Sequence, residues 1–344
     1  GILVIGLIYI FAIFLRQPLS YILNLSILPL SLLSLILGIL FFNVIKFSEK
    51  TLEGRDFIKK DILQLAIILL GLKISFAQLT SVSIQSIVII IVTISLILLA
   101  YLALSKLWPA QKELSKLLAI GTSICGVTAI MASSSVLKSK DYEVGLAVLV
   151  VILLGSLAVF IYPVFIEWYF ISDLAKGVFL GIGIHDTSQV LAAAMVHSDL
   201  YLNNKVLEVA TITKLLRNLF IVLLIPTLVI LKNKGNNYNP KNSPLMKSII
   251  NSIPLFVLGF ITLIFFRTMI DTFYVNSEIW GSIFKVSEKV TTILFGLALT
   301  ALGASINLKK IFNQGYAPVL IGMVYSLVAF FSVCILIFIL GLNI

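Results

Sequence analysis

Charged residues are scarce in this sequence, and their scarcity excludes a water-soluble globular fold. Only 12% of the 344 residues are Asp, Glu, Lys or Arg, whereas 60% are hydrophobic, and the mean hydropathy is +1.13. Soluble domains contain about 25% charged and about 50% apolar residues. The composition therefore predicts an integral membrane protein with many spans of about 20 residues each.

The sequence also lacks the motifs of several function classes. Its two cysteines, Cys125 and Cys334, lie inside apolar runs, so no disulfide framework or CxxC metal site is expected. There is no HExxH motif, no GxxxxGK[ST] loop and no pair of catalytic carboxylates. We therefore expect neither an enzyme nor an ATP-driven pump, and neither a metal nor another cofactor.

Long apolar runs dominate what is present. They are continuous rather than alternating, which indicates helices rather than strands. We expect an all-α polytopic membrane protein with about eleven spanning helices, near residues 1–15, 27–45, 62–79, 86–105, 117–137, 143–166, 175–196, 207–231, 250–266, 287–307 and 316–340. No small-residue cleavage site follows the first run, which we therefore interpret as a span rather than a signal peptide.

Basic residues divide unevenly between alternate loops of this arrangement. The even-numbered loops hold 15 of them: Lys46, Lys50, Arg55, Lys59, Lys60, Lys106, Lys112, Lys116, Lys176, Lys232, Lys234, Lys241, Lys247, Lys309 and Lys310. The odd-numbered loops hold 7: Arg16, Lys138, Lys140, Lys205, Arg267, Lys285 and Lys289. Cytoplasmic loops carry such an excess. We predict an inner-membrane location, with the N-terminus cytoplasmic and the C-terminus outside. The net charge of +10 thus reflects topology and not a nucleic-acid partner.

The chain is expected to form one transporter-like membrane domain in two parts. The polar, turn-rich segment 232–249 is interpreted as a cytoplasmic hinge that joins residues 1–232 to residues 250–344. Leu, Gly and Ile recur at the same spacing in segments 70–79 and 302–311. Because the helices that hold these segments are seven apart, they are expected to run in opposite directions, as in an inverted repeat.

A second internal similarity links segments 121–132 and 181–192, in which Gly, Ile and Ala match. These segments lie two spans apart and are expected to run parallel, which would exclude an inverted pair. The glycines Gly121, Gly126, Gly181 and Gly183 permit two interpretations. They allow close helix packing, or they mark broken helices whose N-terminal N–H groups face an anion.

Ionisable residues inside spans are costly and indicate function. Lys214 and Arg217 lie three residues apart on one helical face. Either they are a structural pair neutralised by Asp186, or they bind an anion, with the planar fork of Arg suited to an oxyanion. His185 and Asp186 are either a packing pair or a proton relay. Lys73 is an accessory charge in the outer half of its span.

Together these motifs resemble the YeiH-type sulfate exporter family. The resemblance covers nearly the whole chain and rests on 121–126, 184–190, 210–217, Gly71-Leu72-Lys73 and Leu302-Gly303. The family usually has Glu where this chain has Asp186, so the reach of the carboxylate is shorter here. The resemblance implies a relative of cation/proton antiporters and bile-acid symporters, with inverted repeats, discontinuous crossing helices, a core beside a scaffold domain, alternating access and a homodimer.

The leading hypothesis is a secondary active transporter of a small inorganic or organic anion, of the sulfate or sulfonate exporter type, coupled to protons or sodium. Asp186 and His185 are the candidate coupling residues. The candidate substrate-binding residues are Lys214, Arg217, His185, Gln189, Thr122, Ser123, Cys125, Gly126 and Ser305. The alternatives are a cation/proton antiporter that uses Asp186, or an intramembrane enzyme or receptor.

Overall fold

The computed structural model is built of helices joined by turns and short loops over the residues that it describes. These residues are 1–22, 30–73, 84–107, 109–221, 223–224, 227–228, 255–273, 278–307, 309 and 316–343. The all-α prediction is confirmed. Within these residues, five helices are long and apolar enough to cross a membrane: Ile2–Leu19 within α1 (Ile2–Ile22), α6 (Ile84–Leu107), Tyr142–Tyr169 within α9 (Asp141–Tyr169), Ser282–Ala304 within α16 (Glu278–Ala304) and α18 (Ala317–Ile339). The chain is a polytopic membrane protein.

The remaining helices are shorter. They are α2 (Leu30–Val44), α3 (Glu49–Phe57), the π-helix η1 (Ile58–Ile62), α4 (Leu63–Leu70), the 3-10 turns η2 (Gly71–Lys73) and η3 (Pro109–Gln111), α7 (Lys112–Ser123), α8 (Val127–Leu137), α10 (Asp173–Gly183), α11 (Thr187–Tyr201), α12 (Asn204–Leu219) and α15 (Leu255–Phe273). Helix α3 lies where the sequence analysis placed a loop. Glu49 in its first turn and Arg55 in its last turn complement the helix dipole.

The chain folds into two compact units, and each is assembled from separate stretches of sequence. The first unit comprises residues 1–82, 194–204 and 255–310, and the second comprises 83–193, 205–254 and 311–344. The expected hinge at 232–249 lies outside the described residues, so the division at that loop stays a prediction. So does the inverted repeat between segments 70–79 and 302–311.

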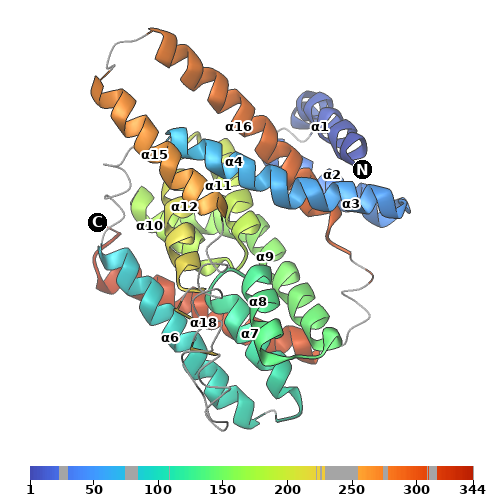
Figure 1. The fold of residues 1–344 in the computed structure, drawn as a ribbon, viewed down its shortest axis with the longest axis vertical. Helices are drawn as coiled ribbons and strands as arrows, with labels where there is room; N and C mark the ends of the chain where they lie inside the picture. Colours follow the sequence, from blue (N-terminus) through green and yellow to red (C-terminus); the bar gives the residue numbers. More distant parts are fainter. Residues whose placement is uncertain are drawn as a thin grey trace, which may run out of the picture. The chain divides into compact units, whose positions relative to one another are not determined.

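In the first unit, α16 packs against α2 and α4, and α15 packs against α4 (Figure 1). Polar side chains at helix ends join these elements. Arg55 donates a hydrogen bond to the carbonyl of Ala304, at the C-terminus of α16, over 3.3 Å. Asp199 accepts hydrogen bonds from the backbone N–H and the hydroxyl of Ser31, in the first turn of α2. Each contact satisfies backbone groups that a helix end leaves unpaired.

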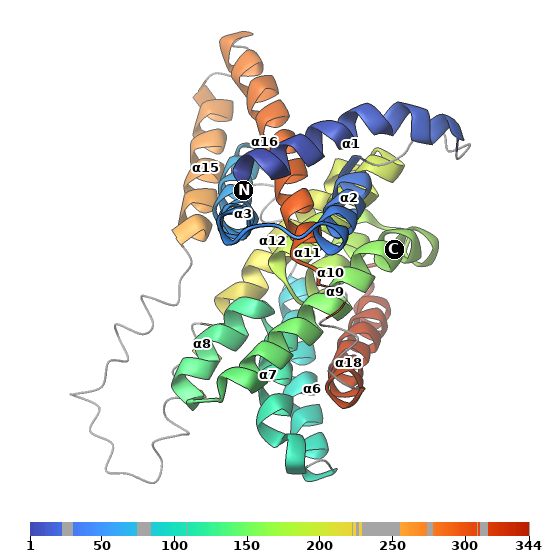
Figure 2. The same ribbon diagram turned by 90° about the vertical axis from the view of Figure 1, so that its right-hand side faces the viewer.

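In the second unit, α7 and α8 form a helical hairpin, and the expected span at 117–137 therefore does not cross in one piece. Helix α7 ends at Ser123, and a Cβ at Gly121 would lie 2.8 Å from the Ile130 side chain in α8. The N-terminal end of α7 and the C-terminal end of α8 line one cavity, at Glu113 and Lys138. We call this element the first hairpin and residues 124–126 its tip. Helix α7 also contacts α6, α9 and α18, beside which it lies in Figures 1 and 2.

Helices α10 and α11 form a second hairpin, with its tip at residues 184–186. The contacts of two glycines show that α10 and α12 run parallel. Gly177 lies against Val209, and Gly181 lies further along both helices, against Thr213. Helix α12 begins three residues after α11 ends, so α11 has to return along α10 to reach that point. The span expected at 175–196 is therefore also a hairpin.

The two hairpins enter from opposite ends of α9. This helix has 29 residues, which corresponds to about 43 Å and exceeds the hydrocarbon core of a bilayer. Its first residues lie at the base of the first hairpin, and its last residue, Tyr169, precedes the second hairpin by four residues. Helix α7 has 12 residues, or about 18 Å, and reaches only about half as far.

The hairpins also correspond position by position. Adding 60 to the residue numbers of the first tip, 124–126, gives the second tip, 184–186, and the same shift relates the start of α8 to the start of α11. The sequence similarity between 121–132 and 181–192 follows this register. The expectation that these segments run parallel is wrong, because each is a hairpin and only α9 crosses between them. Their opposite entry is the relation expected of an inverted pair.

Candidate functional site

The tips of the two hairpins touch each other inside the second unit. Gly126 has φ +65°, and a Cβ built on it would lie 3.0 Å from the Cα and Cβ of Asp186. A side chain here would be strained by the backbone angle and would push against the opposite tip. Gly126 therefore permits the two breaks to meet.

Lys214, on α12, joins the tips through their backbone. Its ammonium donates hydrogen bonds to the carbonyls of Ile124 (3.1 Å), Ile184 (2.9 Å) and His185 (2.5 Å). Its side chain is fully buried. All three donors of an ammonium group are thus directed at helix ends.

Arg217 makes a similar set of contacts one turn later. Its Nε donates to the carbonyl of Ser123 over 2.9 Å, its Nη2 to Thr122, and its Nη1 to Ile182 and, over 3.3 Å, to Ile184. This side chain too is fully buried. The last turns of α7 and α10 leave carbonyls unpaired, and the two resident cations satisfy them where the helix dipoles are negative.

Neither interpretation of the pair named these partners. Among the described residues, no ion pair joins Asp186 to Lys214 or Arg217; the contacts of the two cations are with backbone carbonyls. The sequence identified the two buried charges as unusual, but it gave no sign of these partners, because any residue type supplies a carbonyl.

Asp186 lies at the N-terminus of α11. Its Oδ2 accepts hydrogen bonds from the backbone N–H of Ser188 over 3.0 Å and from the Ser188 hydroxyl. The carboxylate thus acts as an N-cap, a position at which Asp is favoured. The equivalent residue of the first hairpin is Gly126, which offers no side chain to cap α8. Thr128 corresponds to Ser188 and is exposed.

His185 and Gln189 connect the second tip to neighbouring helices. The Nε2 of His185 lies 2.7 Å from the Ser326 hydroxyl on α18, and its Nδ1 is buried and has no hydrogen-bond partner in the described part of the chain. Gln189 donates to the carbonyl of Ile152 over 2.8 Å and to the Ser156 hydroxyl over 3.3 Å, both on α9. The tip is therefore linked to two long helices of the same unit.

The remaining candidates divide into two groups. Thr122, Ser123 and Cys125 are buried at the first tip, with Cys125 a free thiol. Ser305 belongs to the other unit, at the end of α16, where its hydroxyl donates to the carbonyl of Leu302. The side chain of Lys73 is not among those that the structure describes. Within the described residues, no group of three or more His, Cys, Asp or Glu is placed to hold a metal ion.

Sequence reasoning did not select two residues near the tips. They are Ser326 beside His185, and Asn218, whose Nδ2 donates to the Thr187 hydroxyl over 3.1 Å. Thr128, at the start of α8, is visible in the sequence as one of the small polar residues near Gly126, and the correspondence of segment 121–132 with 181–192 aligns it with Ser188. No comparable signal in the sequence marks Ser326.

Comparison with known proteins places the chain among membrane proteins. The family model for conserved hypothetical protein 698 matches residues 1–322. The chain belongs to this family. A UPF0324 membrane protein of Streptococcus pneumoniae is 31% identical over 66% of this chain and 64% of its own length. Those of Clostridium tetani (28%; 65% and 64%) and Vibrio vulnificus (30%; 64% and 65%) are also similar.

The predicted YeiH-type family is thereby confirmed. The matched part of the chain covers less than two thirds of the length of these relatives, and their names state a membrane protein without an activity. No solved structure matches the chain.

Proposed function

We propose that the chain is a secondary active transporter of a small anion. The observation that carries this proposal is the meeting of two short hairpins, tip to tip, at the buried cations Lys214 and Arg217. Breaks in helices near the middle of a membrane are where secondary transporters hold their substrates. Irregular backbone is tolerated there only when it is buried in protein or lines a water-filled cavity.

The balance of charge at the tips favours an anion. Lys214 and Arg217 supply two positive charges and Asp186 one negative charge. Two helix C-termini and two helix N-termini add about −0.5 and about +0.5 elementary charge each, and these cancel. A net charge of about +1 remains in a buried region, which a monovalent anion would neutralise.

The N-terminus of α8 is where we place the anion. At the equivalent end of α11, the Asp186 carboxylate occupies the cap and accepts hydrogen bonds from the N–H and hydroxyl of Ser188. At α8, Gly126 leaves the cap without a side chain, and the exposed Thr128 has the same two donors. A substrate oxyanion is proposed to take the place that a carboxylate holds in the other hairpin.

A cation substrate fits this site less well. Carbonyls at broken helices bind sodium in some transporters, but here Lys214 and Arg217 already donate to those carbonyls. The expected roles of Lys214 and Arg217 therefore change from direct ligands to fixed charges that attract the anion. Asp186 and His185 are proposed to couple its movement to protons or sodium.

Anion binding tests this proposal. The full chain, purified in detergent, is titrated with sulfate, a short alkyl sulfonate, acetate and chloride, with and without sodium and at two pH values. Thr128→Val should weaken binding of the preferred oxyanion about 10-fold, because one charge-assisted hydrogen bond is lost, while Thr128→Ser should retain it. Thr262→Val, an exposed threonine on α15 in the other unit, is the matched control.

Two results would contradict the proposal. One is that no oxyanion binds to the folded wild-type protein. The other is that reconstituted protein moves protons in response to sodium or lithium without any anion, which would establish the cation/proton antiporter instead.

A further inference from the structure

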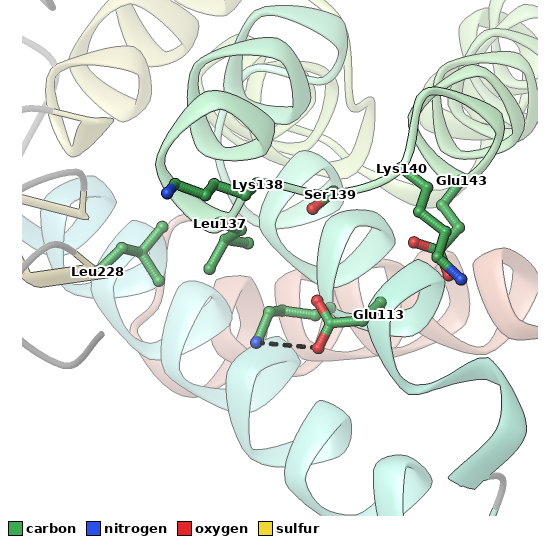
Figure 3. A pocket seen from close by; sticks show the side chains of 8 residues that line it. Glu113, Leu137, Lys138, Ser139, Lys140, Glu143 and Leu228 are labelled. Atoms are coloured by element: carbon green, nitrogen blue, oxygen red, sulfur yellow. Dashed lines mark hydrogen bonds and ion pairs between the residues drawn. The ribbon is translucent and has the colours of Figure 1, made fainter. Parts of the chain in front are cut away.

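A cavity of about 430 Å³ lies at the base of the first hairpin, at the opposite end from the tip. It is formed where α7 begins, α8 ends and α9 begins (Figure 3). Three lysines line it: Lys116 on α7, Lys138 at the C-cap of α8, and Lys140 at the N-cap of α9. Lys116 precedes the other two lysines by more than 20 positions, and the hairpin brings all three to one cavity.

The two acids of the cavity leave these lysines undercompensated. Glu113 lies 3.5 Å from Lys116 and, like Glu143, sits in the first turn of a helix. A carboxylate in a first turn interacts favourably with the positive end of the helix dipole. No ion pair links Lys138 or Lys140 to another described side chain. Figure 3 shows these two lysines on either side of Ser139, with Glu113 across the cavity.

Local backbone and polar groups support a ligand here. Lys138 has φ 56° and ψ 44°, the left-handed conformation that Gly usually takes at this helix position. The hydroxyl oxygen of Ser139, between Lys138 and Lys140, is buried and has no hydrogen-bond partner among the described residues. A hydroxyl without a partner is costly unless something binds it.

The position of the cavity identifies the source of the ligand. The membrane-capable stretch of α9 starts at Tyr142, two residues after Lys140, so the cavity lies at the end of a span. Its wall includes the apolar side chains of Leu137 and Leu228, and Tyr142 is exposed beside it. Basic pockets at the ends of membrane helices are suited to anionic lipid headgroups.

We propose that this cavity binds the phosphodiester of an anionic phospholipid headgroup, held by Lys138, Lys140 and the Ser139 hydroxyl, with Lys116 opposite. The proposal goes beyond the transport function, since the cavity lies at the base of the hairpin and the substrate is placed at the tip. A bound lipid would fix the base of a hairpin whose tip carries the proposed anion site.

Lipid binding to the full chain in a neutral maltoside detergent tests this site. The purified protein is titrated with dihexanoyl-phosphatidylglycerol, dihexanoyl-phosphatidylcholine and inorganic phosphate, and bound ligand is counted by native mass spectrometry. We expect saturable binding of phosphatidylglycerol, weakened at least 10-fold in the Lys138→Gln/Lys140→Gln double variant. Glu113→Gln should strengthen binding, because it removes a competing carboxylate.

The control is the Lys46→Gln/Lys50→Gln double variant, which changes the net charge equally at exposed lysines of the first unit. If inorganic phosphate displaces phosphatidylglycerol with similar affinity, the cavity binds a soluble anion, and the assignment to a lipid headgroup is wrong. Equal binding of phosphatidylcholine, or equal binding by both double variants, would overturn the proposal. Thr128→Val should leave lipid binding unchanged, so the two proposals can fail separately.

Discussion

At the scale of single residues, the fully buried Lys214 and Arg217 stand out because they are bound to the backbone rather than to carboxylates. Together they donate to carbonyls at residues 122–124, 182, 184 and 185. Their side-chain types could be read from the sequence as costly and therefore important. Their contacts could not, since the acceptors are backbone atoms about 30 and about 90 positions earlier in the chain.

Arg217→Gln is expected to destabilise the protein more than it alters selectivity. It leaves three carbonyls, those of Thr122, Ser123 and Ile182, without a charged donor, and each buried unsatisfied group costs roughly 1–3 kcal/mol. Arg217→Lys keeps the charge but not the planar fork, and should give an intermediate loss. The melting temperature in detergent measures this, with the exposed Lys46→Gln as control. An unchanged melting temperature for Arg217→Gln would exclude the capping role.

Asp186→Asn should retain anion binding and lose the response of transport to pH or sodium. Asn caps a helix about as well as Asp, so the tip keeps its structure while one negative charge disappears. His185→Ala should flatten the pH profile, since it removes the imidazole that contacts Ser326, and imidazole is the side chain whose charge changes nearest to neutral pH. Counterflow in liposomes at several pH values checks both variants. Loss of all anion binding in folded Asp186→Asn would instead favour Asp186 as a cation ligand.

At the scale of elements, the two hairpins show where sequence reasoning succeeds and where it fails. Broken helices were one of the two interpretations of the glycines, and the similarity of 121–132 to 181–192 linked the two segments. The relative direction of these two segments could not be predicted, because an apolar run of about 20 residues is long enough either for one membrane crossing or for two half-length helices. The turn at residues 124–126 decides between them.

Labelling of single cysteines tests the first hairpin. In a chain without Cys125 and Cys334, Lys116→Cys and Lys140→Cys should react with an impermeant thiol reagent from the same side of the membrane. A single crossing between them would place them on opposite sides. The measurement compares intact and inside-out vesicles, and reaction from opposite sides would refute the hairpin.

At the scale of the whole molecule, the two hairpins change how many loop Lys and Arg residues lie on each side of the membrane, and this number is the basis of the predicted orientation. Lys138 and Lys140 join the side that holds Lys116, and Lys176 moves to the other side. The division of loop basic residues then changes from 15 against 7 to 16 against 6. The bias predicts the same orientation as before, with residues 46–61 in the cytoplasm and the C-terminus outside.

This orientation is checked at two sites. Lys59→Cys should require a permeant thiol reagent in intact cells, whereas Lys205→Cys should react with an impermeant one. The reverse pattern would invert the topology. The homodimer implied by the family resemblance stays a prediction, for which the mass of the detergent-purified protein is the measurement.

The first hairpin and the arginine that satisfies its carbonyls are far apart in the sequence, and this separation has a consequence for synthesis of the protein. The Ser123 carbonyl bonds to Arg217, 94 residues later. When the first hairpin leaves the ribosome, its unpaired carbonyls have no donor, and hydrocarbon offers none. The hairpin is therefore expected to wait at the translocon or the membrane surface until α12 has been made. Insertion of the two hairpins and α12 would then be one late, concerted event, and a chain truncated before Arg217 should leave the first hairpin accessible to protease.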